Sequence, residues 1–388
     1  MLKVLHVAGG LEPELGGPTT AILNYVVCAD GPAIESHLVS PIDDVDSPLA
    51  RELRAKLGSH AEKLTLLERT GRFKGRASRW GISLSLARWL QRNASEFDVI
   101  VLHGAWMFSS VAGLFAARRA GKPCVLVPHE SLTEYDVNRK GSAARIIAKR
   151  NLKRAYGKHC RLFVFTSRAE AAQSFPTGSS ARQTVLPYPL YDDRGDSTPV
   201  PRTFVDPAFR IGFLGRLHPK KNVDMLLRAV ALLPERFTLT IGGDGPADLK
   251  IKLESLAGEL GIVRRVSWKG FISSDRKDNF FQSIDVLVMP SAFESFGIVA
   301  AEAMMRGVPA IVSPQTGAAE IIAEHGGGLA VESKETMLAE ALLSLDRDRA
   351  CVTELSKEAI AVSAKELSFS HIGARFGDQL TDVARVRT

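Results

Sequence analysis

The chain has few cysteines, no long hydrophobic run and no pattern of a secretory leader. Its 388 residues include four cysteines, Cys28, Cys124, Cys160 and Cys351, which share neither a disulfide framework nor a metal-ligand spacing. No apolar stretch approaches the roughly 20 residues that a membrane span needs. The amino terminus has no basic segment followed by an apolar one, so we expect no signal peptide. These absences favour a cytoplasmic protein with reduced thiols.

Several phosphate and metal motifs are also missing. The chain contains no Gly-x-x-x-x-Gly-Lys-Ser/Thr loop and no Gly-x-Gly-x-x-Gly fingerprint, which disfavours an NTPase or a dehydrogenase. Two Asp-x-Asp pairs occur, at 44–46 and 346–348. The first lies in a Pro-flanked acidic loop and the second at the end of a surface helix. We therefore expect no bound metal, and the pair at 44 and 46 is the remaining candidate.

Basic residues are concentrated in the first half of the chain. Residues 1–200 contain 27 Lys and Arg against 19 Asp and Glu, whereas the remainder contains 23 against 24. The excess gathers in two helical stretches, 69–92 and 139–161, the first of which carries Trp80 and Trp89. Such faces fit an anionic membrane surface or a lipid-phosphate acceptor, and a solvated face is the alternative. No nucleic-acid motif accompanies the charge, so we expect no nucleic-acid partner.

Strand-like and helix-like segments alternate along the whole chain, which predicts an α/β protein with parallel, doubly wound sheets. A chain of 388 residues exceeds the size at which one core stops growing, so we expect two domains. The polar stretch 188–207 contains several prolines and predicts a linker. We place the first domain at 1–198 and the second at 199–365, followed by a helical segment at 366–388.

The expected strands are short apolar runs rich in β-branched residues. They lie at 2–8, 35–39, 99–103, 124–128 and 162–166 in the first domain, and at 211–215, 239–242, 266–268, 286–289 and 310–312 in the second. Helices are expected near 18–30, 48–57, 80–94, 107–120, 142–155, 168–175 and 223–233.

The segment from Ser291 to Glu302 is the most informative one. It reads Ser-Ala-Phe-Glu-Ser-Phe-Gly-Ile-Val-Ala-Ala-Glu, follows a predicted buried strand and opens a helix. The first amides of a helix carry partial positive charge and free N–H groups, so a phosphate is a natural ligand of this turn. Glu294 lies before the helix and Glu302 within it, so the two carboxylates have different tasks. A dipole-stabilising acid and a solvated helix acid are the plain alternatives.

A second segment, Gly212-Phe-Leu-Gly-Arg-Leu-His-Pro-Lys-Lys-Asn222, runs from a strand into a basic loop. Arg216 can bind phosphate oxygens at two points, and Lys221 provides a mobile point charge, which is the usual pair for a diphosphate. Open parallel sheets bind ligands beyond the carboxyl ends of their strands, where both segments lie. Simple surface cations are the alternative.

In this order and at this separation, the two segments resemble the donor site of retaining glycosyltransferases of family 4. That family has the GT-B fold, in which two doubly wound Rossmann-like domains face each other across a cleft. The resemblance extends to Gly16-Gly-Pro18, His103-Gly-Ala-Trp106, Pro128-His-Glu-Ser131 and Gly242-Gly-Asp-Gly-Pro246, so it covers nearly the whole chain. Within the family, the chain resembles bacterial group 1 members of the exopolysaccharide and lipopolysaccharide type. The resemblance implies that segment 366–388 crosses back to the first domain.

The resemblance implies a nucleotide-diphosphate sugar as the donor, with UDP or GDP as the nucleotide, held mainly by the second domain. Arg216 and Lys221 would neutralise the diphosphate, Glu294 would bond the sugar hydroxyls, and Glu302 would accept from the ribose. Further donor contacts are expected at Gly16, Gly17, Gly215, Gly243, Ser295, Phe296, Gly297 and Ile298. No cofactor and no metal ion are expected.

The same resemblance places His129 beside the reacting sugar and the acceptor, as the acceptor-side catalytic group. It would orient or polarise rather than take a proton, because the retaining reaction is often drawn as a front-face substitution in which the leaving phosphate is the base. His103, Trp106 and Glu130 are further acceptor-side candidates, and Glu130 stands where the family often has Gly. Buried structural histidines are the alternative for His103 and His129.

Together these features predict a metal-independent retaining glycosyltransferase. Its acceptor would be a saccharide or lipid-linked saccharide in cell-surface polysaccharide synthesis, with peripheral contact at the inner face of an anionic membrane. Two alternatives are open: a non-catalytic nucleotide-sugar-binding protein, and another reaction on the same frame, by a sugar phosphorylase or a sugar-nucleotide epimerase.

Overall fold

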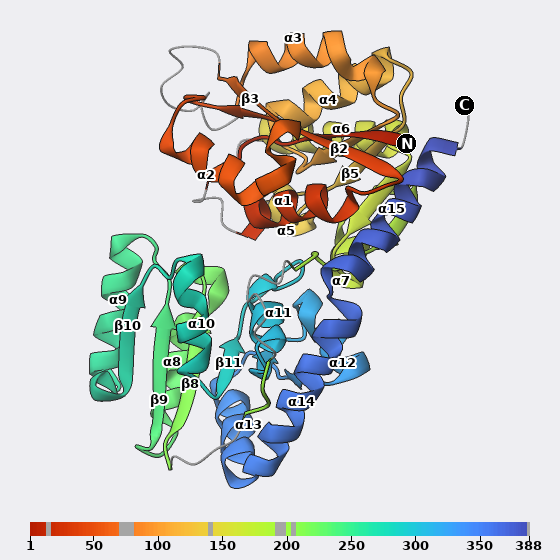
Figure 1. Ribbon diagram of the computed structural model, residues 1–388. Coiled ribbons are helices and arrows are strands. Elements are labelled where there is room, and N and C mark those ends of the chain that lie inside the picture. Colours follow the sequence, from red (N-terminus) through yellow and green to blue (C-terminus); the bar gives the residue numbers. More distant parts are fainter. Residues whose placement is uncertain (13–16, 70–80, 139–142, 191–198, 203–206, 386–388) are drawn as a thin grey trace. The chain divides into compact units, whose positions relative to one another are not determined.

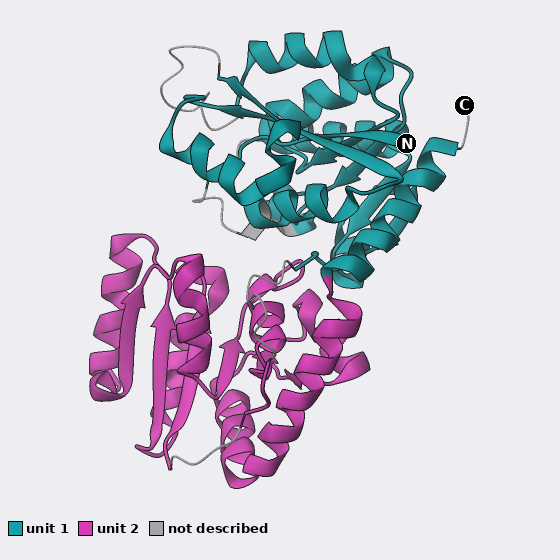
Figure 2. Ribbon diagram, in the orientation of Figure 1, with its two compact units in different colours: residues 1–191, 369–388 teal, residues 192–368 magenta. Residues whose placement is uncertain are grey.

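The computed structural model describes residues 1–12, 17–69, 81–138, 143–190, 199–202 and 207–385. They form two compact units (Figure 2): unit 1 comprises Met1–Tyr191 and Phe369–Thr388, and unit 2 comprises Asp192–Ser368. Each unit contains a parallel sheet with helices in the crossovers (Figure 1). This arrangement confirms the predicted α/β class.

Unit 1 has a seven-stranded sheet in the order β3-β2-β1-β4-β5-β6-β7 among its described residues. The strands are β1 (Leu2–Val7), β2 (Ile34–Ile42), β3 (Leu64–Glu68), β4 (Val99–His103), β5 (Cys124–Val127), β6 (Leu162–Phe165) and β7 (Arg182–Val185). The helices are α1 (Gly17–Ala29), α2 (Pro48–Leu57), α3 (Leu84–Asn93), α4 (Phe108–Arg119), α5 (Glu134–Asn138), α6 (Ala143–His159), α7 (Arg168–Ser174) and α15 (Phe369–Arg385).

Unit 2 has a six-stranded sheet in the order β10-β9-β8-β11-β12-β13 within its described part. The strands are β8 (Phe209–Leu214), β9 (Phe237–Gly242), β10 (Val266–Gly270), β11 (Val286–Met289), β12 (Ala310–Val312) and β13 (Gly328–Ala330). The helices are α8 (Val223–Ala231), α9 (Ala247–Glu259), α10 (Ser274–Gln282), α11 (Ile298–Met305), α12 (Gly317–His325), α13 (Glu335–Arg347) and α14 (Arg349–Glu366).

The sheet of unit 2 is buried on both faces, as its central strands show. Val286 and Val288 of β11 pack into one apolar cluster, whereas Leu287 and Met289 pack into another. Successive side chains of a strand point to opposite faces, so the two clusters are separate cores on the two sides of the sheet. Strands buried in this way read as continuous apolar runs, which is why β11 and β12 were predicted at their observed bounds.

Three of the described strands were not predicted from the sequence. All three lie at sheet edges: β3 and β7 in unit 1 and β13 in unit 2. An edge strand is paired on one side only and is less enclosed. Most residues of β3 and β7 are accordingly half-buried or exposed. Their sequences, Leu-Thr-Leu-Leu-Glu and Arg-Gln-Thr-Val, therefore lack the purely apolar run that marks a central parallel strand.

The last helix, α15, packs against α1 in unit 1. At the crossing, a Cβ added to Gly373 would lie 2.2 Å from the carbonyl oxygen of Cys28, so only glycine lets the two backbones approach this closely. Phe376 is fully buried and its ring centroid lies 5.0 Å from that of Tyr25. Arg375 donates to the carbonyl of Val185 at the end of β7. The helix is thus part of the core of unit 1.

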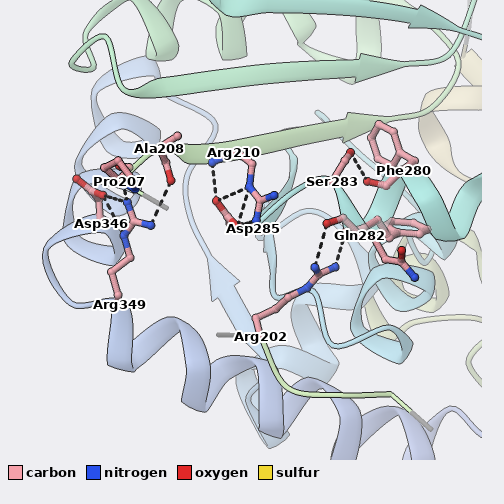
Figure 3. A network of polar contacts seen from close by, with 11 residues as sticks. Arg202, Pro207, Ala208, Arg210, Phe280, Gln282, Ser283, Asp285, Asp346 and Arg349 are labelled. Atoms are coloured by element: carbon pink, nitrogen blue, oxygen red, sulfur yellow. Dashed lines mark hydrogen bonds and ion pairs between the residues drawn. The ribbon is translucent and has the colours of Figure 1, made fainter. Parts of the chain in front are cut away.

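An arginine network closes unit 2 at the amino ends of its strands (Figure 3). Arg210 at the start of β8 donates to Asp285, which immediately precedes β11, with an Nη2–Oδ1 distance of 2.6 Å. Arg202 donates to two carbonyl groups at the end of α10. Arg349 donates to Asp346 and to two carbonyl groups just ahead of β8. These contacts fix the chain as it enters the sheet, at the end opposite the carboxyl-end loops.

Candidate functional site

The two predicted donor motifs meet because β8 and β11 are neighbours in the sheet. Asn222, in the left-handed conformation before α8, donates through Nδ2 to the carbonyl of Pro290. The amide of Ala292 donates to the carbonyl of Lys220 at 2.8 Å. The loops that follow the two strands are therefore hydrogen-bonded to each other at the carboxyl edge of the sheet, where open parallel sheets bind ligands.

An ion pair joins the motifs directly. Nζ of Lys221 lies 2.6 Å from Oε1 of Glu294, and the two side chains are 16% and 13% exposed. Burial alone would raise the pKa of Glu294, but Lys221 and Lys220 outweigh burial and lower the pKa below its ordinary value. Glu294 is therefore ionised at neutral pH. Arg216 is exposed, in the same loop as Lys221.

Glycines let neighbouring loops interlock at this edge. Gly243, after β9, has a φ of 130°, and a Cβ added there would lie 1.9 Å from the carbonyl oxygen of Gly215, after β8. The amide of Gly215 donates to the carbonyl of Gly242, and that of Gly243 to the carbonyl of Gly270. Any side chain at position 243 would force the loops apart. The floor of the candidate site is thus made of backbone.

The turn before α11 is also held by hydrogen bonds from the start of α12. The amide of Gly317 donates to the carbonyl of Glu294, and the amide of Ala318 donates to that of Phe296 at 2.6 Å. Ser295 and Phe296 are buried. Gly297, with a φ of 96°, is the N-cap residue of α11. The opening amides of α11, from Ile298 on, therefore lie close in sequence to the ion-paired Glu294 at a helix start suited to an anion.

Glu302 lies within α11 and has a different partner. Its Oε1 accepts from Nζ of Lys277 on α10 at 2.5 Å. Its Oε2 is buried and has no hydrogen-bond partner among the described residues. A buried carboxylate oxygen of this kind needs a donor, and a ligand hydroxyl would supply one. The structure thus gives Glu294 and Glu302 separate surroundings.

On unit 1, His129 and Glu130 follow β5 and both have left-handed backbone, with φ values of 49° and 71°. Two successive non-glycine residues in this region are strained, and such strain is held by surrounding contacts. The buried carboxylate of Glu170 supplies them: its Oε1 accepts from the amide of Glu130 at 2.6 Å, and its Oε2 accepts from the amide of Thr166. Burial raises the pKa of Glu170.

Glu170 was not predicted. A signal was present, because Ser167-Arg-Ala-Glu170 has the capping-box spacing of a helix start, and the Ser167 hydroxyl does accept from the amide of Glu170. That pattern predicts a cap only. Nothing in it indicates that the carboxylate also reaches the loop of Glu130, since that contact depends on β5 and β6 lying side by side.

The other acceptor-side candidates are engaged within unit 1. The Trp106 indole N–H donates to Oδ2 of Asp136 at 2.5 Å, and Nζ of Lys149 lies 4.9 Å from the Trp106 ring centroid and also donates to Asp136. His103 is buried, and both of its ring nitrogens lie 2.9 Å from nitrogens of other histidines. His103 thus has both ring nitrogens engaged, as His129 also has, but His103 is buried whereas His129 is half-buried.

The glycines near the start of the chain and the two Asp-x-Asp pairs lie outside the two regions described above. Gly16 lies outside the described residues, and Gly17 opens α1. Oδ1 of Asp44 accepts from the amide of Asp46 in the turn before α2. Asp346 binds Arg236 and Arg349, and these contacts lower its pKa against the effect of burial. In the part of the chain that the structure describes, no three His, Cys, Asp or Glu side chains are grouped to hold a metal.

The described part of the basic stretches of unit 1 contains half-buried, paired cations and exposed ones. Lys149 and Lys153 of α6 donate to groups of their own unit, whereas Arg145 and Lys158 of the same helix are exposed.

A groove of about 530 Å³ lies between α3 and α4 and is lined by Arg88, Arg119 and the exposed apolar side chains Leu84, Val111 and Phe115. Trp89 packs against the core, and Trp80 lies outside the described residues. No described helix is both long and apolar enough to cross a bilayer.

Two family models match this chain. The model described as "Glycosyl transferases group 1" matches residues 201–362, and the model described as "Glycosyl transferase 4-like domain" matches residues 16–189. The first match lies within unit 2 and the second within unit 1. Both site regions described above are therefore included.

Curated relatives point the same way. A D-inositol 3-phosphate glycosyltransferase of Mycolicibacterium gilvum is 38% identical over 134 residues, which is 34% of this chain and 30% of that protein. An uncharacterized 41.2 kDa protein in the cps region of Klebsiella pneumoniae is 26% identical over 348 residues, 86% of this chain and 87% of that protein. For several relatives of higher identity, the match spans only about a third of their length.

Solved structures share the whole fold. HepE of Anabaena, in complex with UDP and glucose, superposes with a TM-score of 0.76 at 19% identity and covers 98% of this chain and 100% of its own. WaaG, a glycosyltransferase involved in lipopolysaccharide biosynthesis, superposes with a TM-score of 0.68 at 18% identity and covers 98% and 100%. At these identities the likeness shows the fold alone.

Proposed function

The chain belongs to the group 1 glycosyltransferases and has their two-domain GT-B fold, and from this premise we propose that it is a metal-independent, retaining enzyme that transfers a sugar from a nucleotide-diphosphate sugar to a saccharide or lipid-linked saccharide. The observation that carries the proposal is the meeting of Lys221 and Glu294 at the carboxyl ends of β8 and β11. The loop also presents Arg216, and the start of α11 adds backbone amides.

These groups suit a diphosphate leaving group. As the bond between the anomeric carbon and the diphosphate breaks, negative charge grows on the phosphate oxygens, and Arg216, Lys221 and the opening amides of α11 can neutralise it without a metal. A single group of this kind contributes about 3 kcal/mol to transition-state stabilisation. The acceptor oxygen then bonds to the same face of the anomeric carbon, and its proton passes to the leaving phosphate. No cofactor takes part in this scheme.

The two glutamates would divide the donor between them. Glu294, held ionised beside Lys221, would accept from hydroxyls of the transferred sugar. Glu302 would accept from the ribose through Oε2, the oxygen that Lys277 does not occupy. UDP is our first choice of nucleotide because HepE has been solved with UDP, with UDP and glucose, and with UDP-glucose. GDP is the second.

On the acceptor side we propose His129, with Trp106 and Glu130 nearby in the same unit. Its imidazole is hydrogen-bonded at both nitrogens, so it would polarise and orient the site rather than take a proton. WaaG is described as acting in lipopolysaccharide biosynthesis, and a cell-surface polysaccharide acceptor for this chain is consistent with that.

The proposed location is cytoplasmic, in peripheral contact with an anionic membrane surface. The groove between α3 and α4 supports this part of the proposal, because it combines exposed apolar side chains with Arg88 and Arg119. Apolar residues flanked by cations are the composition of surfaces that lie in the headgroup region of anionic bilayers. A solvated basic face is the alternative.

The deciding experiment is a screen of UDP-, GDP-, ADP- and dTDP-sugars for thermal stabilisation and for slow donor hydrolysis without acceptor. Arg216→Ala and Glu294→Ala are measured beside the wild type, with Arg228→Ala, an exposed cation on α8, as the matched control. We expect one donor to stabilise and to be hydrolysed, with both site variants reduced at least about 100-fold and the control unchanged. A donor that binds without any turnover would instead indicate a non-catalytic nucleotide-sugar-binding protein.

A further inference from the structure

Four rings in unit 1 form a continuous row of hydrogen bonds. Nδ1 of His6 lies 2.9 Å from Nε2 of His103, and Nδ1 of His103 lies 2.9 Å from Nε2 of His129. Nδ1 of His129 lies 2.9 Å from the hydroxyl oxygen of Tyr188. His103 and His129 each use Nδ1 toward one neighbour and Nε2 toward the other, and His6 uses Nδ1 toward His103, so the row has a direction.

The sheet produces this row by its register. His6 of β1 pairs with Val101 of β4, and His103 lies two residues beyond Val101. His103 in turn pairs with Val127 of β5, and His129 lies two residues beyond Val127. A step of two residues keeps a side chain on the same face of a strand. The histidines therefore step diagonally from β1 to the last residue of β4 and then to His129, two residues after the end of β5.

The rings lie end to end rather than stacked. Neighbouring rings are inclined by 16° between His6 and His103, by 22° between His103 and His129, and by 19° between His129 and Tyr188, with centroids 5.2 to 5.6 Å apart. These small angles, with nitrogens 2.9 Å apart, describe in-line hydrogen bonds. Tyr25 and Phe376 pack beside the row.

Burial keeps the three imidazoles uncharged. It lowers the pKa of His6 and of His129 to about 3 and the pKa of His103 well below its ordinary value. A neutral imidazole has one N–H and one lone pair. Because every contact in the row needs one donor and one acceptor, the proton position on one ring fixes the proton position on the next.

Only two arrangements satisfy the whole row. In the first, every histidine is protonated on Nδ1 and donates toward Tyr188. In the second, Tyr188 donates to His129, every histidine is protonated on Nε2, and the row ends in an N–H on His6. Nε2 of His6 is buried and has no hydrogen-bond partner among the described residues. A buried N–H without an acceptor is rarer in proteins than an unused lone pair, which favours the first arrangement.

We propose that His6, His103, His129 and Tyr188 act as one unit in which every imidazole carries its proton on Nδ1, and that His6 and Tyr188 are positioning residues that fix the tautomer and ring orientation of His129. His6 does so from two rings away, through contacts of 2.9 Å. The catalytic consequence rests on the proposed acceptor-side role of His129. The tautomer assignment itself does not.

The test is nitrogen-15 NMR of the full chain labelled at histidine, with long-range nitrogen–hydrogen couplings used to assign tautomers at pH 7. We expect His6, His103 and His129 to be neutral Nδ1–H imidazoles, with the exposed His371 as the reference outside the row. His6→Leu should disturb the ring signals of both His103 and His129, and Tyr188→Phe should disturb the row from its other end. In His6→Asn the side-chain amide can still donate to His103, so the ring signals of His129 should stay unchanged. This variant keeps the test decisive if His6→Leu fails to fold.

An Nε2–H tautomer at any of the three positions would overturn the assignment. So would a His129 signal that does not respond to His6→Leu in a variant that folds. With the donor identified, His6→Leu should lower kcat about 10-fold and leave the KM for donor within about twofold, whereas His6→Asn should be close to wild type. If no donor is turned over at all, the proposed function fails, while the NMR result still decides the tautomer unit.

Discussion

Nζ of Lys221 lies 2.6 Å from Oε1 of Glu294, although the two residues belong to loops after different strands. This contact is the link between the two motifs of the donor site. It also contributes to the stability of unit 2, because a partly buried carboxylate that loses the nearer cation keeps only the weaker effect of Lys220.

Lys221→Met should therefore lower the free energy of unfolding of unit 2 by about 3 kcal/mol at pH 7. The pKa of Glu294 is lower in the folded state than in the unfolded state. The ion pair therefore stabilises the fold fully at pH values above the ordinary carboxyl pKa of 4.5. This stabilisation is lost as the pH falls through the lowered pKa of the folded state. Native-state hydrogen exchange in β8 and β11 at pH 7 and at pH 3 measures the difference. Lys252→Met, at an exposed position on α9, is the control. An effect of equal size at both pH values would contradict the ion-pair account.

Glu170→Gln should destabilise unit 1 by about 2 kcal/mol at pH 4, because a glutamine amide places N–H groups against the donors that Glu170 now accepts. Burial raises the pKa of Glu170 in the folded state. Its contribution is therefore fully present below the unfolded value of 4.5 and is lost as the pH rises through the folded value. Urea unfolding from pH 4 to pH 8 should show the gap between wild type and variant narrowing. A gap that widens with pH would show that the ionised form is the stabilising one.

Gly243→Ala should destabilise unit 2 by about 3 kcal/mol or more, because the added Cβ meets a carbonyl oxygen in a left-handed backbone. Gly258 on α9 is the matched control, since a Cβ there meets nothing within 4 Å. Gly258→Ala should stabilise the same unit by up to about 1 kcal/mol, because alanine has the higher helix propensity. Thermal unfolding of both variants distinguishes the two effects. Equal behaviour of the two variants would show that the loops after β8 and β9 can separate freely.

The sequence was informative where a motif and a strand coincide. Arg216, Lys221, Glu294 and Glu302 are predicted because their segments follow apolar runs and resemble the family's donor site. Carboxyl ends of parallel strands meet at one edge of a sheet. The roles of these residues stay predictions. What could not be predicted was the identity of their partners: Lys277, which binds Glu302, comes from a helix whose rotation about its axis depends on packing.

The histidine row was beyond sequence reasoning for a related reason. The sequence indicates His103 and His129 singly, each as an acceptor-side candidate, and it does not indicate His6. Their connection depends on the register of β1, β4 and β5, and a shift of one residue would turn a side chain to the other face. The register between two strands that are far apart in the chain cannot be predicted from the sequence of either strand alone.

Phe376→Ala on α15 should lower the free energy of unfolding of unit 1 by about 3 to 5 kcal/mol, the range for truncating a buried aromatic side chain. Hydrogen exchange in β1 and α1 should rise, while exchange in β8 and β11 of unit 2 should stay the same. The control is Phe115→Ala in the same unit, at a side chain that is 65% exposed. A uniform rise in both units would mean that α15 stabilises the chain as a whole.

Phe115→Ser combined with Arg119→Ser should weaken binding to vesicles of anionic phospholipid about 10-fold or more, because one apolar anchor and one surface cation are removed together. Co-sedimentation at low and at high salt measures this, and binding should fall with salt. The control is Val263→Ser with Arg264→Ser, an exposed apolar and basic pair in unit 2. If the double variant at Phe115 and Arg119 binds vesicles as the wild type does, the groove is a solvated basic face and not a membrane-binding surface.

The position of α15 has a consequence for how the protein is made. Unit 2 is inserted within the chain of unit 1, whose last helix is synthesised after every residue of unit 2. Emerging from the ribosome, unit 2 has its whole chain available before unit 1 does, because Phe376 and Gly373 must still cover α1. The usual order, in which the amino-terminal domain is finished first, is therefore reversed here. Until α15 is translated, His6 and Tyr25 lack the helix that covers them, and a chain truncated near position 368 would contain the whole of unit 2 but an incomplete unit 1.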